Sequence, residues 1–379
     1  MDNKMITKTP NRAKTTKIML VLALSLVLCI MMAMFVGCTP NQTEDPDQGL
    51  EFVIPAGEPD PTFGLNGETP TDLKYFKYEE IDENGEKAIA ITGTFTQATE
   101  LKKIVIPAVI DGKKVTRLYD SALATLYSLE EVVVSGYVVD VRPYVFRDCW
   151  SLKTVKFPAN LLRLSEGAFQ GCKAIEDLSF IVPSIKVLGA RVFEGCTNLK
   201  SANIPDTVTS IGEYAFLDCK SLAEVKFPAG MTAIPNRMFQ GCTSLEKTIG
   251  NDTFVMPATI KTIGDYAFAG AKFKPIVLPE GLETIGKSAF AGCPRIREVA
   301  IPDTVKTIGD GAFSNCQLLK EVKMPLSDKT TLGANIFEGS KKIEKITVKA
   351  GSKAETYCND WATKSTTLSN YSAITIVTQ

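Results

Sequence analysis

Residues 204–222 read IPDTVTSIGEYAFLDCKSL, and variants of this stretch recur through most of the chain. Its phenylalanine, Phe216, belongs to a series whose members are 23, 24, 23, 23, 29, 22, 23 and 24 residues apart. The series comprises Phe146, Phe169, Phe193, Phe216, Phe239, Phe268, Phe290, Phe313 and Phe337. A nearly fixed period of this length indicates repeat units that stack on one another and bury one continuous core.

Each unit contains a short strand of pattern L-x-x-V-x-I-P, which is clearest in residues 101–107, 222–228 and 319–325. Because side chains alternate across a strand, positions 4 and 6 should point inward and positions 3 and 5 to the opposite face. Proline closes the strand, since it has no N–H to donate to a ladder. With Leu123 and Phe95 added to the phenylalanine series, the pattern predicts about eleven coils of ~23 residues over 95–348. The predicted fold class is a β-rich α/β solenoid with a parallel sheet.

The return segment of each unit follows the pattern V-x-x-I-G-x-x-A-F. Glycine stands four residues before the phenylalanine at Gly189, Gly212, Gly264, Gly286, Gly309 and Gly333. A glycine that recurs in this way indicates either a positive φ or a close approach to the next coil. From this glycine to the cysteine that follows the phenylalanine, we expect one helical turn. The phenylalanine itself should fill the interior, where burial of each ring is worth roughly 1.5–3 kcal/mol.

Two units are longer than the others. Five extra residues lie between Pro107 and Leu123, around Asp111, and six lie between Leu245 and Phe254. Insertions in solenoids emerge as loops and can carry binding residues. The alternative is that these two insertions are merely tolerated variation in length.

The N-terminal 37 residues resemble a bacterial lipoprotein signal peptide. A basic start leads into the apolar run of residues 18–36, which is broken only by Ser25 and ends at Gly37-Cys38. The resemblance implies lipid attachment at Cys38, although Phe35 replaces the leucine that is usual in the lipobox. The alternative is an uncleaved membrane anchor, because 19 apolar residues approach the length of a membrane span. Both interpretations place the rest of the chain outside the cytoplasmic membrane.

The remaining segments are a tether and two caps. Residues 38–73 are rich in proline and acids and contain no lysine or arginine, which is typical of a disordered tether or a passive spacer. Residues 74–94 form two apolar runs around Asn84-Gly85, which predicts an N-terminal β-hairpin cap. Residues 349–379 should form a C-terminal cap, with a capping box at Ser352–Glu355, a helix to about Trp361 and a last strand.

Composition excludes several classes of function. The chain has no histidine, so catalytic sites and zinc sites that need histidine are absent. Without residues 1–37, the chain has 42 − 5 = 37 basic and 43 − 1 = 42 acidic residues, a net charge of −5. A mildly acidic body is a poor nucleic-acid binder. We therefore expect no catalytic residues, no metal, no cofactor and no nucleic-acid partner.

One cysteine follows the phenylalanine by three residues in seven units: Cys149, Cys172, Cys196, Cys219, Cys242, Cys293 and Cys316. Many cysteines in an exported protein usually indicate disulfides. However, one cysteine per coil gives a column whose side chains point the same way, which is poor geometry for a bridge or for a zinc site. Ala271 and Ser340 occupy the same place in two units. We expect reduced, buried, structural thiols.

The outward side of the strands is the candidate binding face. From positions 3 and 5 we select Lys103, Glu131, Thr154, Lys156, Asp177, Ser201, Asn203, Glu224, Lys226, Thr253, Glu298, Glu321, Lys323, Lys345 and Thr347. Neither position contains an aromatic residue, whereas strong protein interfaces favour Trp, Tyr and Arg. Tyrosines two residues before the phenylalanine, at Tyr144, Tyr214 and Tyr266, form a second candidate row, either exposed for binding or partly packed.

The pattern I-P-x-x-V-x-x-I-G-x-x-A-F-x-x-C-x-x-L resembles the BspA-like leucine-rich repeats of bacterial and protist surface proteins, with the best fits at residues 204–222 and 301–319. The resemblance implies a right-handed solenoid with its parallel sheet on the concave face, and a surface-exposed, non-enzymatic role in adhesion or protein binding. It implies host or neighbouring-cell surface proteins as partners of a lipid-anchored, monomeric body. The alternative is a cell-envelope polysaccharide-binding or purely structural module.

Overall fold

The computed structural model describes residues 68–83, 85–274, 276–366 and 374–378. The chain divides into two compact units, Met1–Val53 and Ile54–Gln379. The first unit, with the predicted signal peptide 1–37 and Cys38, lies outside the described residues, as does the predicted tether up to residue 67.

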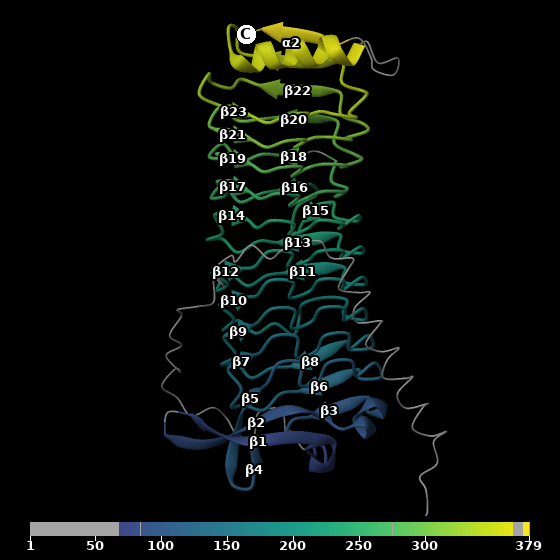
Figure 1. The fold of residues 1–379 in the computed structure, drawn as a ribbon, viewed down its shortest axis with the longest axis vertical. Coiled ribbons are helices and arrows are strands. Elements are labelled where there is room, and N and C mark those ends of the chain that lie inside the picture. Colours follow the sequence, from purple (N-terminus) through teal and green to yellow (C-terminus); the bar gives the residue numbers. More distant parts are fainter. Residues whose placement is uncertain (1–67, 84, 275, 367–373, 379) are drawn as a thin grey trace, which may run out of the picture. The chain divides into compact units, whose positions relative to one another are not determined.

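About eleven coils stack along the second unit, and each coil contributes to parallel ladders on two sides of the stack (Figure 1). The repeat strand forms the first ladder, as expected. It consists of β3 (Lys103–Val105), β6 (Glu131–Val133), β8 (Thr154–Lys156), β11 (Ser201–Asn203), β13 (Glu224–Lys226), β15 (Lys247–Thr248), β16 (Phe254–Val255), β18 (Ile276–Val277), β20 (Glu298–Ala300), β22 (Glu321–Met324), β24 (Lys345–Val348) and β25 (Thr375–Thr378). Its hydrogen bonding is interrupted between β8 and β11, β15 and β16, and β18 and β20.

The return segments form a second ladder that the sequence analysis did not anticipate. It comprises β2 (Glu86–Thr94), β5 (Lys113–Leu118), β7 (Asp140–Val141), β9 (Arg163–Leu164), β10 (Val187–Leu188) and β12 (Ser210–Ile211), then β14 (Ala233–Ile234), β17 (Thr262–Ile263), β19 (Thr284–Ile285), β21 (Thr307–Ile308) and β23 (Thr331–Leu332). Equivalent residues pair from coil to coil, as Thr262 with Thr284 and Thr284 with Thr307. The apolar residue before the glycine therefore packs in the core and also belongs to the second ladder.

The nine phenylalanines from Phe146 to Phe337 stack in one column inside the coils, all at 0% exposure. Neighbouring ring centroids are 5.1–6.2 Å apart, with interplanar angles of 7–25°. Leu123 continues the column at 0% exposure, but Phe95 is 44% exposed, so its assignment to the column is wrong. Phe95 instead precedes the short 3₁₀ helix η2 (Thr96–Glu100), whose Ala98 is buried.

The corner around each phenylalanine is not the helical turn expected from the sequence. Two residues per coil have positive φ: one stands two positions before the phenylalanine and the other stands two positions after it. Around Phe216 these are Tyr214 (61°) and Asp218 (57°). Such alternation breaks a helix, because right-handed helical residues all have negative φ. The recurrent glycine itself has no positive φ; a Cβ added to Gly212 would lie 2.3 Å from the backbone nitrogen of Ala190. Close approach between coils is therefore the reason for this glycine.

The cysteines link successive coils through hydrogen bonds. Each thiol of the seven-residue column donates to a carbonyl of the preceding coil at 3.0–3.2 Å, as Cys219 Sγ does to Phe193 O. The Ser340 hydroxyl makes the same bond to Phe313 O at 2.8 Å. All seven thiols are fully buried and unbridged, and burial raises the pKa of Cys149 to about 12. The predicted buried structural thiols are confirmed in this position and also act as donors.

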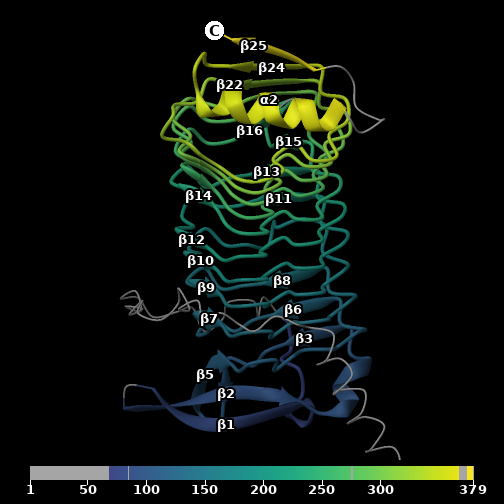
Figure 2. The ribbon, with the colours of Figure 1, turned by 45° about the horizontal axis from the view of Figure 1, so that its top comes forward.

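The two ends of the stack carry the predicted caps (Figure 2). After η1 (Leu73–Tyr75), β1 (Phe76–Glu83) pairs antiparallel with β2 and forms the expected hairpin. At the other end, α2 (Lys353–Thr366) begins after Ser352, whose hydroxyl accepts a hydrogen bond from the Glu355 N–H at 3.2 Å. Trp361 of α2 packs edge-on against Phe337 at 5.6 Å and ends the aromatic column.

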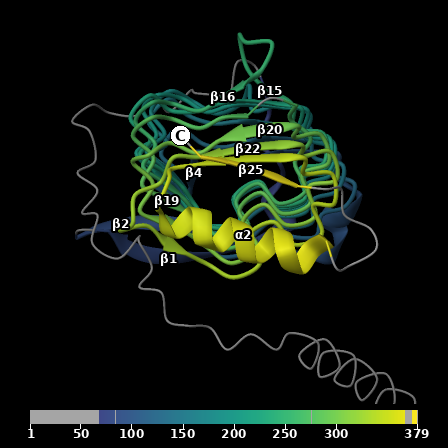
Figure 3. The ribbon, with the colours of Figure 1, turned by 90° about the horizontal axis from the view of Figure 1, so that it is seen from above.

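The two insertions differ in structure. The first forms β4 (Val109–Ile110), which pairs antiparallel with β5 through a turn at Asp111. The second lies between β15 and β16 and projects from the side of the stack (Figure 3). Thr248 holds its base, because its hydroxyl donates to Thr253 O and accepts from the Val255 N–H, both at 3.3 Å.

Candidate binding face

The outward side of the first ladder is the surface that the sequence singled out. Alternation holds along the strands: β8 and β20 each have a buried central residue between two exposed residues. Three of the selected residues lie differently from expectation. Asp177 belongs to no strand, because its carboxylate accepts a hydrogen bond from the Ser179 N–H in a local turn. Thr347 is only 7% exposed in the last coil, where its neighbour in register is Val377.

Thr253, the third of these residues, lies in the coil with the second insertion. Sequence spacing made Thr253 the neighbour of Glu224, but β13 pairs with β15 and sets Lys247 beside Glu224. Their ion pair spans 3.2 Å. The insertion follows β15, so Thr253 lies after it, just before β16, which pairs with β18 and not with β13. The extra residues moved the register, which the spacing alone could not reveal.

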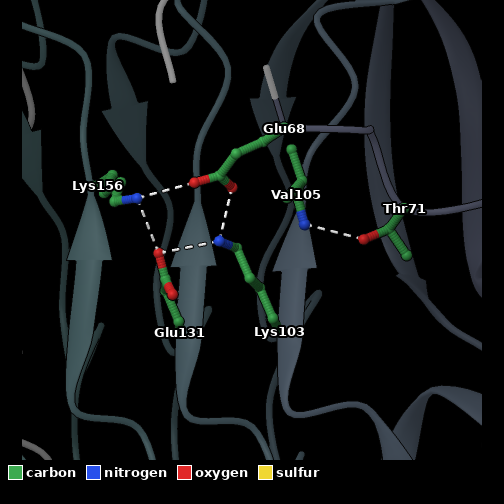
Figure 4. Close-up of polar contacts among 6 residues, drawn as sticks. All are labelled: Glu68, Thr71, Lys103, Val105, Glu131 and Lys156. Atoms are coloured by element: carbon green, nitrogen blue, oxygen red, sulfur yellow. Dashed lines mark hydrogen bonds and ion pairs between the residues drawn. The ribbon is translucent and has the colours of Figure 1, made fainter. Parts of the chain in front are cut away.

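At the N-terminal end of the face, charges are paired with one another (Figure 4). Lys103 and Lys156 lie on either side of Glu131, at 3.3 and 3.0 Å from its carboxylate. Glu68 reaches over these strands from outside the repeats and contacts the same two lysines at 2.7 and 2.9 Å. Hydrogen bonds from both lysines lower the pKa of Glu68, so its carboxylate is ionised at neutral pH.

The segment that carries Glu68 is fixed to the first strand. The Thr71 N–H donates to Val105 O at 3.0 Å, and the Val105 N–H donates to the Thr71 hydroxyl at 2.9 Å. Val105, which this segment contacts, is only 4% exposed, and its register partner Val133 is 1% exposed. Residues 68–73 were predicted as part of the tether, yet here they lie on the solenoid and close this part of the face.

The C-terminal part of the face is open. A hollow of about 690 Å³ lies across β18, β20 and β22, with Ile276 and Leu318 among its apolar lining. Val277, which points outward beside it, is 62% exposed, and its register partner Val255 is 42% exposed. The same strand position is thus covered in the coils of β3 and β6 and bare in the coils of β16 and β18.

The lining of this hollow is mainly basic. It contains four cations, Lys274, Arg295, Arg297 and Lys323, against two carboxylates, Glu298 and Glu321. Arg295 and Lys274 both face Glu246, at 3.0 and 3.7 Å. Arg297 and Lys323 have no ion pair within the described part of the chain. With Glu246 included, four cations face three carboxylates, so the hollow has a small excess of positive charge in a body of net negative charge.

The sequence identified only half of this site. Glu298, Glu321 and Lys323 were selected from strand positions 3 and 5. Lys274 and Arg297 occupy position 2, and Arg295 precedes the strand. The available signal was a local excess of basic residues over 272–297, in the part of the chain that also carries the outward valines.

The tyrosine row is half-buried and interleaved with arginines. Arg191 lies 4.2 Å from the Tyr214 ring centroid, and Arg237 lies 5.6 Å from Tyr214 and 4.5 Å from Tyr266. The Tyr144 hydroxyl donates a short hydrogen bond to Glu166. Burial and this carboxylate raise the pKa of Tyr144 above its usual range. Of the two interpretations of the row, partial packing is the one that the geometry supports.

Two features are absent from the residues that the structure describes. Among them, no three cysteine, aspartate or glutamate side chains converge in a way that could hold a metal ion. No helix within the same residues has the length and apolar character of a membrane span.

Comparison with known proteins identifies the repeat. The model of the BspA type leucine rich repeat region matches in six copies over residues 79–149, 116–246 and 246–364. No curated protein matches the chain.

Several solved structures are similar to this chain, and the first named here shares its fold. A leucine-rich repeat protein from Bacteroides ovatus is 22% identical, with a TM-score of 0.57 over 82% of this chain and 90% of its own. The T. pallidum leucine rich repeat protein is 27% identical, with a TM-score of 0.48 over 53% of this chain and 89% of its own. The pneumococcal vaccine antigen PcpA is 17% identical, with a TM-score of 0.43 over 82% and 98%. The repeat matches, which extend from the N-terminal hairpin to α2, show that the chain belongs to the BspA type leucine-rich repeat family.

Proposed function

We propose that this chain is a non-enzymatic surface protein that binds an acidic segment of a partner protein in the hollow over β18, β20 and β22. The observation that carries the proposal is the basic lining around an apolar floor, with Arg297 and Lys323 free of ion pairs in the described chain. Arginine binds carboxylates through paired hydrogen bonds. The exposed Val277 adds apolar contact next to these charges. Host or neighbouring-cell surface proteins are the class of partner, in line with an adhesive role.

The test measures binding of a defined acidic probe. A fluorescein-labelled peptide of alternating glutamate and leucine is titrated into the full chain in detergent, and anisotropy reports binding. We expect saturable binding that weakens about tenfold or more when Arg297→Glu is combined with Lys323→Glu. Lys186→Glu combined with Lys220→Glu is the control matched in charge, since both lysines are exposed and neither lines the hollow. Equal affinity of the two double variants would contradict the proposal.

The natural partner can be sought at the same place. A photo-crosslinking amino acid at Val277, which is 62% exposed, should capture a protein on intact cells. The same group at Asn203, on the middle of the face, is the comparison. Equal capture of one protein at both positions would mean that the contact extends along the whole face and is not centred on the hollow. That result would contradict the proposal.

The proposal also includes lipid anchoring at Cys38 on the outer side of the cell membrane. Its support is the apolar run of residues 18–36, which ends at Gly37-Cys38. The BspA type repeat is typical of surface proteins, which agrees with this location. Metabolic labelling with a fatty-acid analogue should mark the wild-type chain and not Cys38→Ser. Added protease should digest the repeats on intact cells. Labelling that persists in Cys38→Ser would place the anchor elsewhere.

A further inference from the structure

Two large aromatic side chains lie exposed on consecutive coils, outside the face described above. Tyr127 and Trp150 are 47% and 44% exposed, and their ring centroids are 4.4 Å apart. Each stands two residues before the leucine that opens the strand pattern, between the turn and the first ladder. Lys173, at the same place in the next coil, holds its ammonium 4.1 Å from the Trp150 ring centroid.

The architecture does not require aromatic residues at this place. The later coils carry Thr197, Lys220, Thr243, Ala271, Pro294, Gln317 and Lys341 there. These side chains are polar or small, and the coils that contain them stack in the same way. Leaving two large rings in water is unfavourable in itself, because apolar surface gains free energy when it is covered. The pair therefore needs an explanation other than folding.

The two rings are preorganised for ligand binding. Stacking between the rings and the cation over Trp150 restrict the side-chain rotamers, so less conformational freedom is lost when a ligand binds. Lys173 has no ion pair in the described chain, and its N–H groups can donate to a ligand.

The surroundings of the pair select the class of ligand. Glu130 and Lys153 stand three residues after the two rings. Glu130 forms ion pairs with Lys102 at 3.2 Å and with Lys153 at 2.7 Å, so the three residues form a charged row. The apolar patch is thus two rings wide and bordered by hydrogen-bonding groups, which is small for the core of a protein interface. A sugar ring has the matching chemistry, an apolar C–H face surrounded by hydroxyl groups. We propose that Tyr127, Trp150 and Lys173 form a carbohydrate-binding platform, independent of the hollow on the ladder face.

The chain contains two tryptophans, which makes the proposal directly testable. Trp361 is 7% exposed and packed against Phe337, so it serves as an internal reference. The full chain, labelled with 5-fluorotryptophan in detergent, gives one ¹⁹F resonance per tryptophan, assigned with Trp150→Phe. Chitotetraose, cellotetraose, mannotetraose and tetragalacturonate are titrated as probes. Chitotetraose represents the N-acetylglucosamine chemistry of bacterial cell walls, whereas the other three represent glycans from outside the cell.

We expect at least one probe to shift the Trp150 resonance saturably while the Trp361 resonance stays in place. Tyr127→Ser and Lys173→Ala should each weaken binding of that probe about tenfold, and Lys220→Ala, at the same place in another coil, should not. The proposal is overturned if no probe shifts Trp150 at about 10 mM, a concentration that detects even weak sites. It is equally overturned if both resonances move together, or if the affinity survives in Tyr127→Ser.

Discussion

The turn corner and the outward face of the first ladder belong to the same coils, yet they follow opposite rules. At the corner, each coil from Phe146 to Phe337 presents a buried phenylalanine and two residues of positive φ. On the outward face the residues change from coil to coil, from paired charges at Glu131 to a bare valine at Val277. What is repeated specifies the stack, and what varies is available for binding. Substitutions at the two places should therefore have very different effects.

The largest effect is expected from Phe216→Ala. It removes a ring stacked between Phe193 and Phe239 at 5.4 and 5.5 Å and leaves a cavity. The free energy of unfolding should fall by about 3–5 kcal/mol, as measured by denaturant titration. Phe95→Ala is the control, because that ring is 44% exposed and its loss should change stability by less than about 0.5 kcal/mol. Similar losses in the two variants would show that the stacked column does not carry the stability.

A smaller effect should follow Gly212→Ala, which tests the close approach at the corner. The added Cβ would lie 2.5 Å from the Ala190 Cα, and neither backbone can move freely. We expect a destabilisation of about 1–3 kcal/mol, the usual cost of overpacking. The matched control is Gly230→Ala, where no atom lies within 4 Å and φ is not positive. That change should leave the melting temperature unchanged or raise it slightly; a fall equal to that of Gly212→Ala would refute the contact.

Cys219 allows the hydrogen bond to be separated from the packing. Cys219→Ala removes the donor to Phe193 O and should cost about 1–2 kcal/mol. Cys219→Ser keeps a donor at the same place, as Ser340 does naturally, and should cost less. Thermal unfolding of the two variants gives the comparison. A serine variant that is less stable than the alanine variant would mean that the thiol acts as a filler and that its hydrogen bond contributes little.

The smallest effect is expected on the face, from Glu68→Gln. Loss of the two ion pairs to Lys103 and Lys156 should release residues 68–72 while the coils remain folded. Amide hydrogen exchange at Val105 should accelerate, because its N–H donates to Thr71. Glu79→Gln, on the exposed side of β1, is the control.

The same contact should depend on pH. The pKa of Glu68 is lowered from 4.5 in the folded chain, so its stabilising contribution is fully present above pH 4.5 and is lost as the pH falls through the lowered value. Protection of the Val105 amide, measured relative to its intrinsic exchange rate at each pH, should therefore fall in the wild type only below about pH 4.5 and approach that of Glu68→Gln. An unchanged difference between the two proteins at low pH would exclude the ion pairs as the cause.

The sequence predicted the fold in outline because the repeated residues all serve one purpose. The phenylalanine column, the outward strand positions, the hairpin around Gly85 and the helix after Ser352 follow from local rules that each coil repeats. The second ladder was missed because two-residue strands such as β12 have no pattern of their own. The left-handed residues were missed because Tyr214 and Arg237 are not typical of positive φ.

The candidate site was less accessible to prediction, because it depends on register between coils. The insertion after Thr248 changed which side chains are neighbours, and it separated Thr253 from Glu224. Glu68 reached Lys156 over 88 residues of sequence. The hollow formed where the hydrogen bonding between β18 and β20 is interrupted. None of these relations is contained in the order of residues within one coil.

The contacts that join one coil to the next are the same at nearly every step, a ring on a ring and a thiol on a carbonyl. The gene can therefore gain or lose a coil by recombination between its own repeats without new solutions for the core. Removal of residues 204–226, for example, would bring Phe239 onto Phe193 and Cys242 to the carbonyl that Cys219 now contacts. Trp361 would still end the column, since the ring that it packs against, Phe337, is the last of the series. Lineages of such a protein can thus differ in the length of the surface that they display while they keep the same two ends.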